Sequence, residues 1–186
     1  IRRQRQMCIR DRVMTAQYVR AAKVNTTLWK MYTSSDLRRS KYFNQVTVSN
    51  ILVAKGGSNQ YSCSFRVGEI YLNAAEAALM TGESAIPAAR TYLLTLIKQR
   101  YKAAAYTEKE TAINAMGRDE LLQEIYDERT RELAFEGHRW FDLRRTTRPR
   151  IEKVIDGKTY ILEKDDARYT LRIPQAAIDA NPELQH

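Results

Sequence analysis

The sequence predicts a mostly α-helical chain that ends in a small β hairpin. Three observations lead to this fold class. Residues 65–102 carry apolar side chains at helical spacing in two segments that Gly82 separates. Residues 119–145 mix charged and large apolar side chains and are expected to form one long helix. From Ile151 onward, apolar side chains recur at every second residue, which is the spacing expected for a β-strand.

Composition narrows the classes of partner. The 186 residues include 31 Lys and Arg and 22 Asp and Glu, which gives a formal net charge of +9. Such a balance is typical of proteins that bind nucleic acid or anionic membranes. Residues 1–12 account for +4 of it, and the remaining +5 is spread along the chain without a long basic run. Nucleic acid is therefore not expected as a partner.

The sequence predicts no disulfide framework and no membrane-spanning segment. Cys8 and Cys63 are too few for a disulfide framework. No apolar run approaches the length needed to span a bilayer. Residues 1–12 are basic but lack the apolar centre of a signal peptide, so no export signal is expected within them.

We expect three regions along the chain. Residues 1–12 have neither helical nor strand period and resemble translated sequencing-adapter read-through, which predicts a non-native or disordered tail. Residues 13–65 combine short apolar runs with loop residues, which predicts a partial loop and extended region. Residues 66–186 carry the long periodic segments and are expected to form a C-terminal helical region with a β hairpin.

Within residues 13–65 the expected elements are short. Residues 13–24 have apolar residues at helical spacing, and the triplet Asn25-Thr26-Thr27 is expected to end that helix. Residues 46–48 and 50–54 are β-branched and apolar, and are expected to form short strands or extended connections.

The sequence predicts a pair of helices, over residues 65–80 and residues 87–102. Gly82 provides the stop after the first helix. Ser84 is expected to cap the second helix and Pro87 to lie in its first turn. The pair resembles a tetratricopeptide-type hairpin. The expected buried faces are Val67, Ile70, Tyr71, Ala74, Ala75, Ala78 and Leu79 in the first helix and Ala88, Tyr92, Leu93 and Leu96 in the second.

The remaining elements follow in order. Residues 103–118 are polar and predict a connection with a short helix over 108–116, which Gly117 ends. After the long helix, residues 151–155 and 158–162 alternate around Asp156-Gly157, a favoured hairpin turn. Residues 169–173 are expected to add a third strand.

The long helix has an unusual distribution of charge. On a helical wheel, three glutamates share an arc of about 140° with arginines and with Phe135 and Leu143. Charges leave water only when they are paired, so we expect a buried helix whose charges neutralise one another. Glu128 and Arg131, Glu136 and Arg139, and Asp142 and Arg145 have the i,i+3 spacing for such pairs.

The expected network extends to the first helix. We expect Arg131 and Arg139 to be buried partners of the three glutamates, with Arg66 or Glu69 joining them. Gly137 is expected to allow another backbone to approach closely. The alternative is a solvated helix with surface ion pairs, since charged residues are rarely buried.

Residues 128–145 resemble the signature helix of the SusD/RagB family of nutrient-binding outer-membrane lipoproteins. Residues 66–77 match a second helix of that family, and residues 36–43 and 173–184 resemble shorter family segments. The resemblance runs from about Asp36 to Leu184. The residues that carry the family motif are Arg66, Glu69, Glu76, Glu128, Arg131, Glu132, Glu136, Gly137, Arg139 and Asp142.

The resemblance implies a function. Such proteins lie on the outer-membrane surface, bind an oligosaccharide or other nutrient, and deliver it to a SusC-like TonB-dependent transporter. It also implies that the N-terminal lipid anchor and most of the ligand site are absent from this fragment. The alternative is a tetratricopeptide-like adaptor that binds protein segments.

No catalytic or metal-binding set is evident. Arginines on the same arc would keep Glu128 and Glu132 ionised, which favours a structural role over acid–base chemistry. His138 is the one histidine of the expected folded region, so neither a metal nor another cofactor is expected. Trp29, Tyr32 and Tyr42 are candidates for stacking on a sugar ring, with core packing as the alternative for each.

Overall fold

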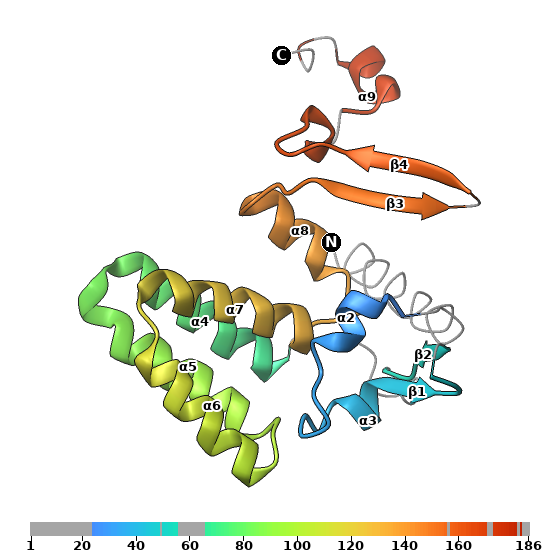
Figure 1. The fold of residues 1–186 in the computed structure, drawn as a ribbon. Coiled ribbons are helices and arrows are strands. Elements are labelled where there is room, and N and C mark those ends of the chain that lie inside the picture. The colour runs from blue at the N-terminus through green and yellow to red at the C-terminus, as the bar shows by residue number, and fades with distance from the viewer. Residues whose placement is uncertain are drawn as a thin grey trace. The chain divides into compact units, whose positions relative to one another are not determined.

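The computed structural model describes residues 24–48, 50–55, 66–155, 157–170, 173–181 and 183. The expected tail at residues 1–12 and the expected helix over 13–24 therefore lie outside the described residues, except for Val24. The chain divides into two compact units, residues 1–137 and residues 138–186, and each is described here by itself. The mostly helical fold class with a small β hairpin is confirmed (Figure 1).

The described part of the first unit begins with short elements. Helix α2 spans Thr26–Lys30 and α3 spans Arg39–Tyr42. Strand β1, Phe43–Gln45, pairs antiparallel with β2, Ile51–Val53. The strand expected over residues 50–54 is therefore present. Residues 46–48, expected as a strand or a connection, lie in the connection between β1 and β2, because the chain pairs earlier, from Phe43.

Asn25 is the N-cap of helix α2. Its side-chain oxygen accepts a hydrogen bond from the backbone N–H of Thr27 at 2.7 Å, which satisfies a donor at the start of α2. The helix that residues 25–27 were expected to end lies outside the described residues except for Val24, so that expected break stays a prediction. Around α2, a small core forms from Tyr32, Phe43 and Ile51, with Phe135 packed against it.

Four longer helices form the rest of the first unit (Figure 1). They are α4 (Val67–Thr81), α5 (Ile86–Lys98), α6 (Ala103–Ala115) and α7 (Arg118–Glu132), with the 3-10 turn η2 (Glu83–Ala85) between the first two. Helix α4 packs against both α5 and α7. Their shared core consists of Leu72, Ala75, Leu79, Ala89, Leu93, Leu96, Ile97, Tyr101, Ile113, Leu121 and Ile125.

The buried faces differ in part from those expected. Val67 and Ile70 are 67% and 59% exposed, because α4 turns Gly68, Leu72 and Glu76 toward its neighbours instead. The buried face of α4 thus combines the apolar residues Leu72 and Leu79 with the small residues Gly68 and Ala75 and with the polar residue Glu76.

Helix α5 also differs from expectation in part. Leu93 and Leu96 are buried as expected, but Ala88 and Tyr92 are exposed because the buried face is centred on Ala89 and Leu93. Ser84 lies inside η2 and caps no helix.

The long helix expected over residues 119–145 is two helices. Helix α7 ends at Glu132, and α8, His138–Arg145, begins after a turn. Phe135 and Gly137 have φ values of 66° and 82° in that turn, which is the left-handed region. A Cβ on Gly137 would meet no atom within 4 Å, so the expected close approach at this glycine is wrong.

Helix α6 is longer than expected, because it spans the whole of Ala103–Ala115. Gly117 then forms the N-cap of α7 rather than only ending α6. Its backbone N–H donates to the carboxylate of Glu120 at 3.0 Å, the reciprocal bond of a capping box.

The second unit contains α8, the hairpin of β3 (Ile151–Ile155) and β4 (Lys158–Leu162), the 3-10 turn η3 (Ala167–Tyr169) and α9 (Gln175–Ala180). The hairpin has the expected bounds, and Gly157 has the positive φ that its turn requires.

Tyr169 lies in η3 rather than in a third strand, because its buried ring stacks on Trp140 at 5.2 Å between centroids and its hydroxyl donates to the carbonyl of Pro149. Among the residues that the structure describes, no helix is both long and apolar enough to cross a membrane.

Candidate functional site

The C-terminal half of α7 carries a buried cluster of charge in the first unit. Glu128 and Glu132 are completely buried, and Arg131 is 6% exposed. Carboxylates separated by four residues lie on one face of a helix, so both point toward the segments that pack against α7. The long, charged and yet buried helix predicted from the sequence is confirmed over α7.

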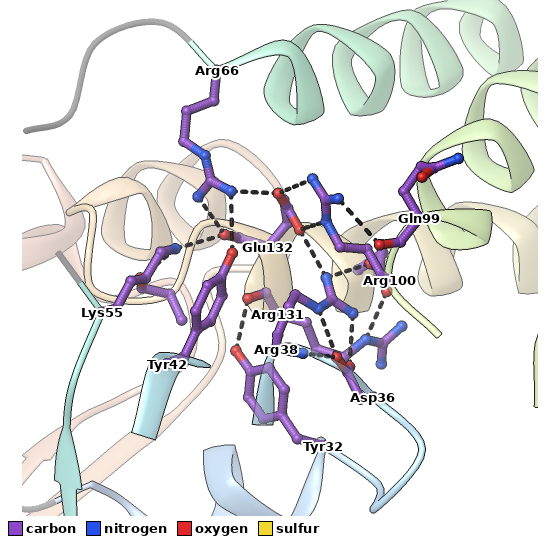
Figure 2. Close-up of polar contacts among 12 residues, drawn as sticks. Tyr32, Asp36, Arg38, Tyr42, Lys55, Arg66, Gln99, Arg100, Arg131 and Glu132 are labelled. Atoms are coloured by element: carbon purple, nitrogen blue, oxygen red, sulfur yellow. Dashed lines mark hydrogen bonds and ion pairs between the residues drawn. The ribbon is translucent and has the colours of Figure 1, made fainter. Parts of the chain in front are cut away.

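Three arginines from different segments surround the carboxylate of Glu132 (Figure 2). Arg38, which precedes α3, donates to Oε2 at 2.9 Å. Arg66, which precedes α4, donates to Oε1 at 2.6 Å. Arg100, which follows α5, binds both oxygens at 2.9 Å in a bidentate pair. Glu132 therefore joins three connections that lie far apart in the sequence.

A second buried carboxylate, Glu128, lies one turn earlier. It accepts from Arg38 at 2.6 Å and from Arg131 at 2.7 Å. The remaining N–H groups of Arg38 bind both carboxylate oxygens of Asp36, which is also buried. Arg131 extends the cluster to Glu124 at 2.7 Å. Arg38 is thus the central cation, because it touches three carboxylates.

The last carbonyl groups of α7 are capped from the same side. Tyr32 donates its hydroxyl to the carbonyl of Arg131 at 2.7 Å. Lys55 donates to the carbonyls of Glu132 and Ala134 at 2.7 and 2.9 Å, and Arg66 donates to that of Glu132 at 3.0 Å. The C-terminus of a helix carries unsatisfied carbonyls and partial negative charge, so cations there stabilise it.

Burial and pairing shift the pKa values in this cluster. Burial alone would raise the pKa of Glu132, but the hydrogen bonds and charges of Arg100, Arg66 and Arg38 outweigh it and lower that pKa to about 2. The pKa of Glu128 is also lowered, because Arg38 and Arg131 outweigh its burial. Burial lowers the pKa of Lys55 to about 8, although Glu136 opposes the shift.

Every carboxylate of this cluster is paired with a cation, and we call the cluster the ion-pair core. Its ion pairs join five carboxylates, Asp36, Glu124, Glu128, Glu132 and Glu136, to six cations, Arg38, Lys55, Arg66, Arg100, Lys109 and Arg131.

The chemistry of the core follows from this pairing. The lowered pKa values of Glu128 and Glu132 keep these two carboxylates ionised, and all five carboxylates are bound by cations, which suits joining segments rather than moving protons. Among the described residues, no group of three or more His, Cys, Asp or Glu side chains is placed to hold a metal ion.

The ion-pair core contains many of the residues that the family motif predicts. Arg66 joins Glu132 and Glu136, as expected for the first helix. The i,i+3 pairs Glu128–Arg131 and Asp142–Arg145 are confirmed, the second within the other unit at 2.9 Å. Glu76 lies in α4 and accepts a hydrogen bond from Tyr126 at 3.3 Å, and Glu69 lies in its first turn.

Arg139 is not a buried partner of the glutamates. It lies in α8 and its side chain is exposed. The turn between α7 and α8 interrupts the helix between Glu136 and Arg139, so the expectation of one continuous helix is wrong, and the expected pair of these two residues stays a prediction. Within the first unit, Lys55 and Arg66 pair with Glu136.

The three candidate aromatic residues lie around the small core of α2 and β1. Tyr32 is 1% exposed, so its ring faces are covered by protein. Tyr42 is half-buried, lies under the ammonium group of Lys55 at 4.2 Å and accepts from Arg66 at 3.1 Å. Trp29 is half-buried and has the guanidinium of Arg39 4.2 Å from its ring centroid. All three contribute to packing.

Sequence reasoning missed several members of the core. Asp36, Arg38, Lys55 and Arg100 come from connections, where helical periodicity gives no signal. The spacing of Asp36 and Arg38 was the available signal, since it lies in a segment that resembles the family. Gly68 was also missed: a Cβ at that position would lie 2.8 Å from Oε1 of Glu132, so Gly68 provides the close approach that was expected at Gly137.

Comparisons with known proteins agree with this geometry. The sequence model of the SusD family matches residues 10–186. Among solved structures, the chain is similar to a SusD-like carbohydrate binding protein from Bacteroides vulgatus ATCC 8482, with 20% sequence identity and a TM-score of 0.56. The similarity covers 88% of this chain but 41% of that protein, and at this identity it shows the fold alone. None of the curated proteins compared matches the chain.

Proposed function

We propose a function from one premise, that the chain belongs to the SusD family. The proposal is that these residues form part of a surface lipoprotein of the outer membrane. That protein binds a glycan or another nutrient and delivers it to a SusC-like TonB-dependent transporter. The observation that carries the proposal is the family match over residues 10–186.

The ion-pair core supports a scaffold role for this part of the protein. Arg38, Arg66 and Arg100 form ion pairs with Glu132 at the end of α7, and these pairs hold the connections before α3, before α4 and after α5 at that helix end. Binding surfaces are commonly built from loops that a rigid framework holds in place. The family motif residues of α7 are therefore structural in this proposal, and ligand contacts come from other parts of the whole protein.

The proposal also describes a binding protein rather than an enzyme. Glu128 and Glu132 have lowered pKa values because arginines surround them, which removes the two strongest acid–base candidates of the sequence. A protein that captures a nutrient for transport has no need to cleave it.

The experiment begins with recovery of the complete reading frame that contains these residues. The proposal expects a signal peptide that ends in a lipid-modified cysteine, and a neighbouring gene for a TonB-dependent transporter. The whole protein, without its lipid, is then tested by isothermal titration calorimetry against a panel of soluble polysaccharides. We expect binding to at least one of them, with no release of reducing sugar.

Two results would refute the proposal. A reading frame without an export signal and with further helical repeats would favour the tetratricopeptide-like adaptor. Release of product from a bound polysaccharide, lost in a Glu128→Gln variant, would indicate an enzyme. A transporter that does not co-purify with the whole protein would remove the delivery step while leaving the binding step intact.

A further inference from the structure

A groove of about 750 Å³ opens between α6 and α7 in the first unit. The two helices diverge from their junction at Met116 and Gly117, where both residues have extended backbone (Figure 1). The wall from α6 is apolar and consists of small side chains, Ala112 and Ala115, with Met116 at its base. Among the residues that line this shallow channel, those from the α6 side carry no charge.

The wall from α7 is acidic. It is lined by Gln123 and by four acids, Asp119, Glu120, Glu124 and Asp127, of which only Glu124 belongs to the ion-pair core. Glu120 accepts from the backbone N–H of Gly117, and Asp127 accepts from the side chain of Gln123, both at 3.0 Å.

Cations neutralise this wall only in part, because Glu124 pairs with Arg131 at 2.7 Å and with Lys109 of α6 at 3.4 Å, whereas the other three acids have no strong ion pair among the described residues. Within the described part of the chain, neither Glu120 nor Asp127 has a Lys or Arg partner within 4 Å. Asp119 is almost fully exposed, and Arg118 lies 3.5 Å from it in a surface pair of little strength. The wall is therefore a strip of negative charge on a chain whose net charge is +9.

We propose that this groove binds a basic amphipathic helix of a partner protein. Helices pack with their axes about 8–10 Å apart, and small side chains such as those of Ala112 and Ala115 allow that approach. The apolar face of the partner would contact the α6 wall and Met116. Lysine or arginine on the flank of the partner would face Asp119, Glu120 and Asp127, where opposite charge favours association. The proposal does not depend on the function proposed above.

The net charge of the chain makes the interaction testable. A chain of charge +9 repels a basic peptide at long range, so binding requires a local negative site. The probe is a fluorescein-labelled peptide of 18 residues, about five helical turns, with leucine on one face and lysine on the rest. One comparison peptide carries glutamate in place of lysine, and a second carries serine in place of leucine. Fluorescence anisotropy measures the affinity of each peptide for the 186-residue chain.

We expect the lysine–leucine peptide to bind at least tenfold more tightly than either comparison peptide. The variant Asp119→Asn, Glu120→Gln, Asp127→Asn is expected to weaken binding at least tenfold. Glutamine at position 120 keeps an acceptor for the N–H of Gly117, so the cap of α7 is retained.

The matched control removes three exposed carboxylates elsewhere, in the variant Glu83→Gln, Glu163→Gln, Asp179→Asn. It is expected to change affinity less than twofold. Ala115→Arg gives a second test, because it blocks the α6 wall without altering an acidic residue, and it is expected to weaken binding at least tenfold. Circular dichroism confirms that each variant is folded.

Three results would overturn the proposal. The first is no binding of the lysine–leucine peptide. The second is equal weakening by the groove variant and by the matched control, which would indicate charge attraction without a defined site. The third is unchanged affinity in Ala115→Arg.

Discussion

Replacement of Arg38 by methionine should destabilise the first unit severely. Arg38 is 3% exposed and its guanidinium binds Asp36, Glu128 and Glu132 at 2.6 to 3.0 Å. Methionine fills similar space but leaves Asp36 as a buried carboxylate without its cation. Removal of one partner from a buried ion pair costs about 3–5 kcal/mol, whereas loss of a surface pair costs under about 1 kcal/mol.

The measurement is urea unfolding followed by tryptophan fluorescence. A Trp140→Phe background leaves Trp29 as the reporter, so the signal comes from the first unit. With a urea dependence of about 2 kcal/mol per M, the expected loss lowers the midpoint by about 1.5–2.5 M. Lys98→Ala in the same background is the control, because Lys98 is exposed and its removal should change stability by less than about 0.5 kcal/mol.

A double variant separates lost pairing from lost packing. Asp36→Asn added to Arg38→Met removes the uncompensated carboxylate, so it should recover at least about 1 kcal/mol of the loss. A loss below about 1 kcal/mol in Arg38→Met, or a double variant less stable than the single one, would refute the view that this cluster holds the unit together.

The remaining predictions concern pH, a cap and a glycine. Because the pKa of Glu132 is about 2 when folded and 4.5 ordinarily, its contribution to stability is complete above pH 4.5 and is lost as the pH falls toward 2. Urea midpoints between pH 6 and 2.5 should show that decline, and a flat profile would contradict it. Tyr32→Phe leaves the carbonyl of Arg131 without its buried donor and should cost about 1–2 kcal/mol in the same assay; an unchanged midpoint would mean that this bond contributes nothing. Gly68→Ala should destabilise by about 1–3 kcal/mol although alanine favours helix, because its Cβ would lie 2.8 Å from the fixed carboxylate of Glu132; a stabilised variant would show that the carboxylate can shift.

Local features of the fold could be predicted from the sequence because neighbouring residues decide them. The β3–β4 hairpin has the predicted bounds, since the alternation of side chains and the turn at Gly157 lie within twelve residues. The pair Glu128–Arg131 depends only on helical spacing. The end of α4 at Gly82 follows from one residue whose φ of 132° other residues rarely adopt.

The break between α7 and α8 shows where local reasoning fails. Residues 119–145 carry one continuous charge pattern, yet the chain turns at Phe135 and Gly137. Phe135 packs beside Phe43 with ring centroids 5.8 Å apart. A favourable contact with a residue far away in the sequence accompanies the turn, and no helical propensity scale contains that contact.

The sequence by itself predicted that α7 buries charge, because its carboxylates and apolar residues share one face. Only the tertiary structure decided which cations meet them. Arg38 and Arg100 reach Glu132 across 94 and 32 residues of sequence, and Lys55 caps α7 across 77. Arginine and lysine are frequent in this chain, so the sequence offers many possible partners for each glutamate. The partners that pair are those on the connections that the packing of α4, α5 and α7 brings to the end of α7. Spacing along a chain fixes neighbours three or four residues apart, whereas distant partners are fixed by the packing of the helices that carry them.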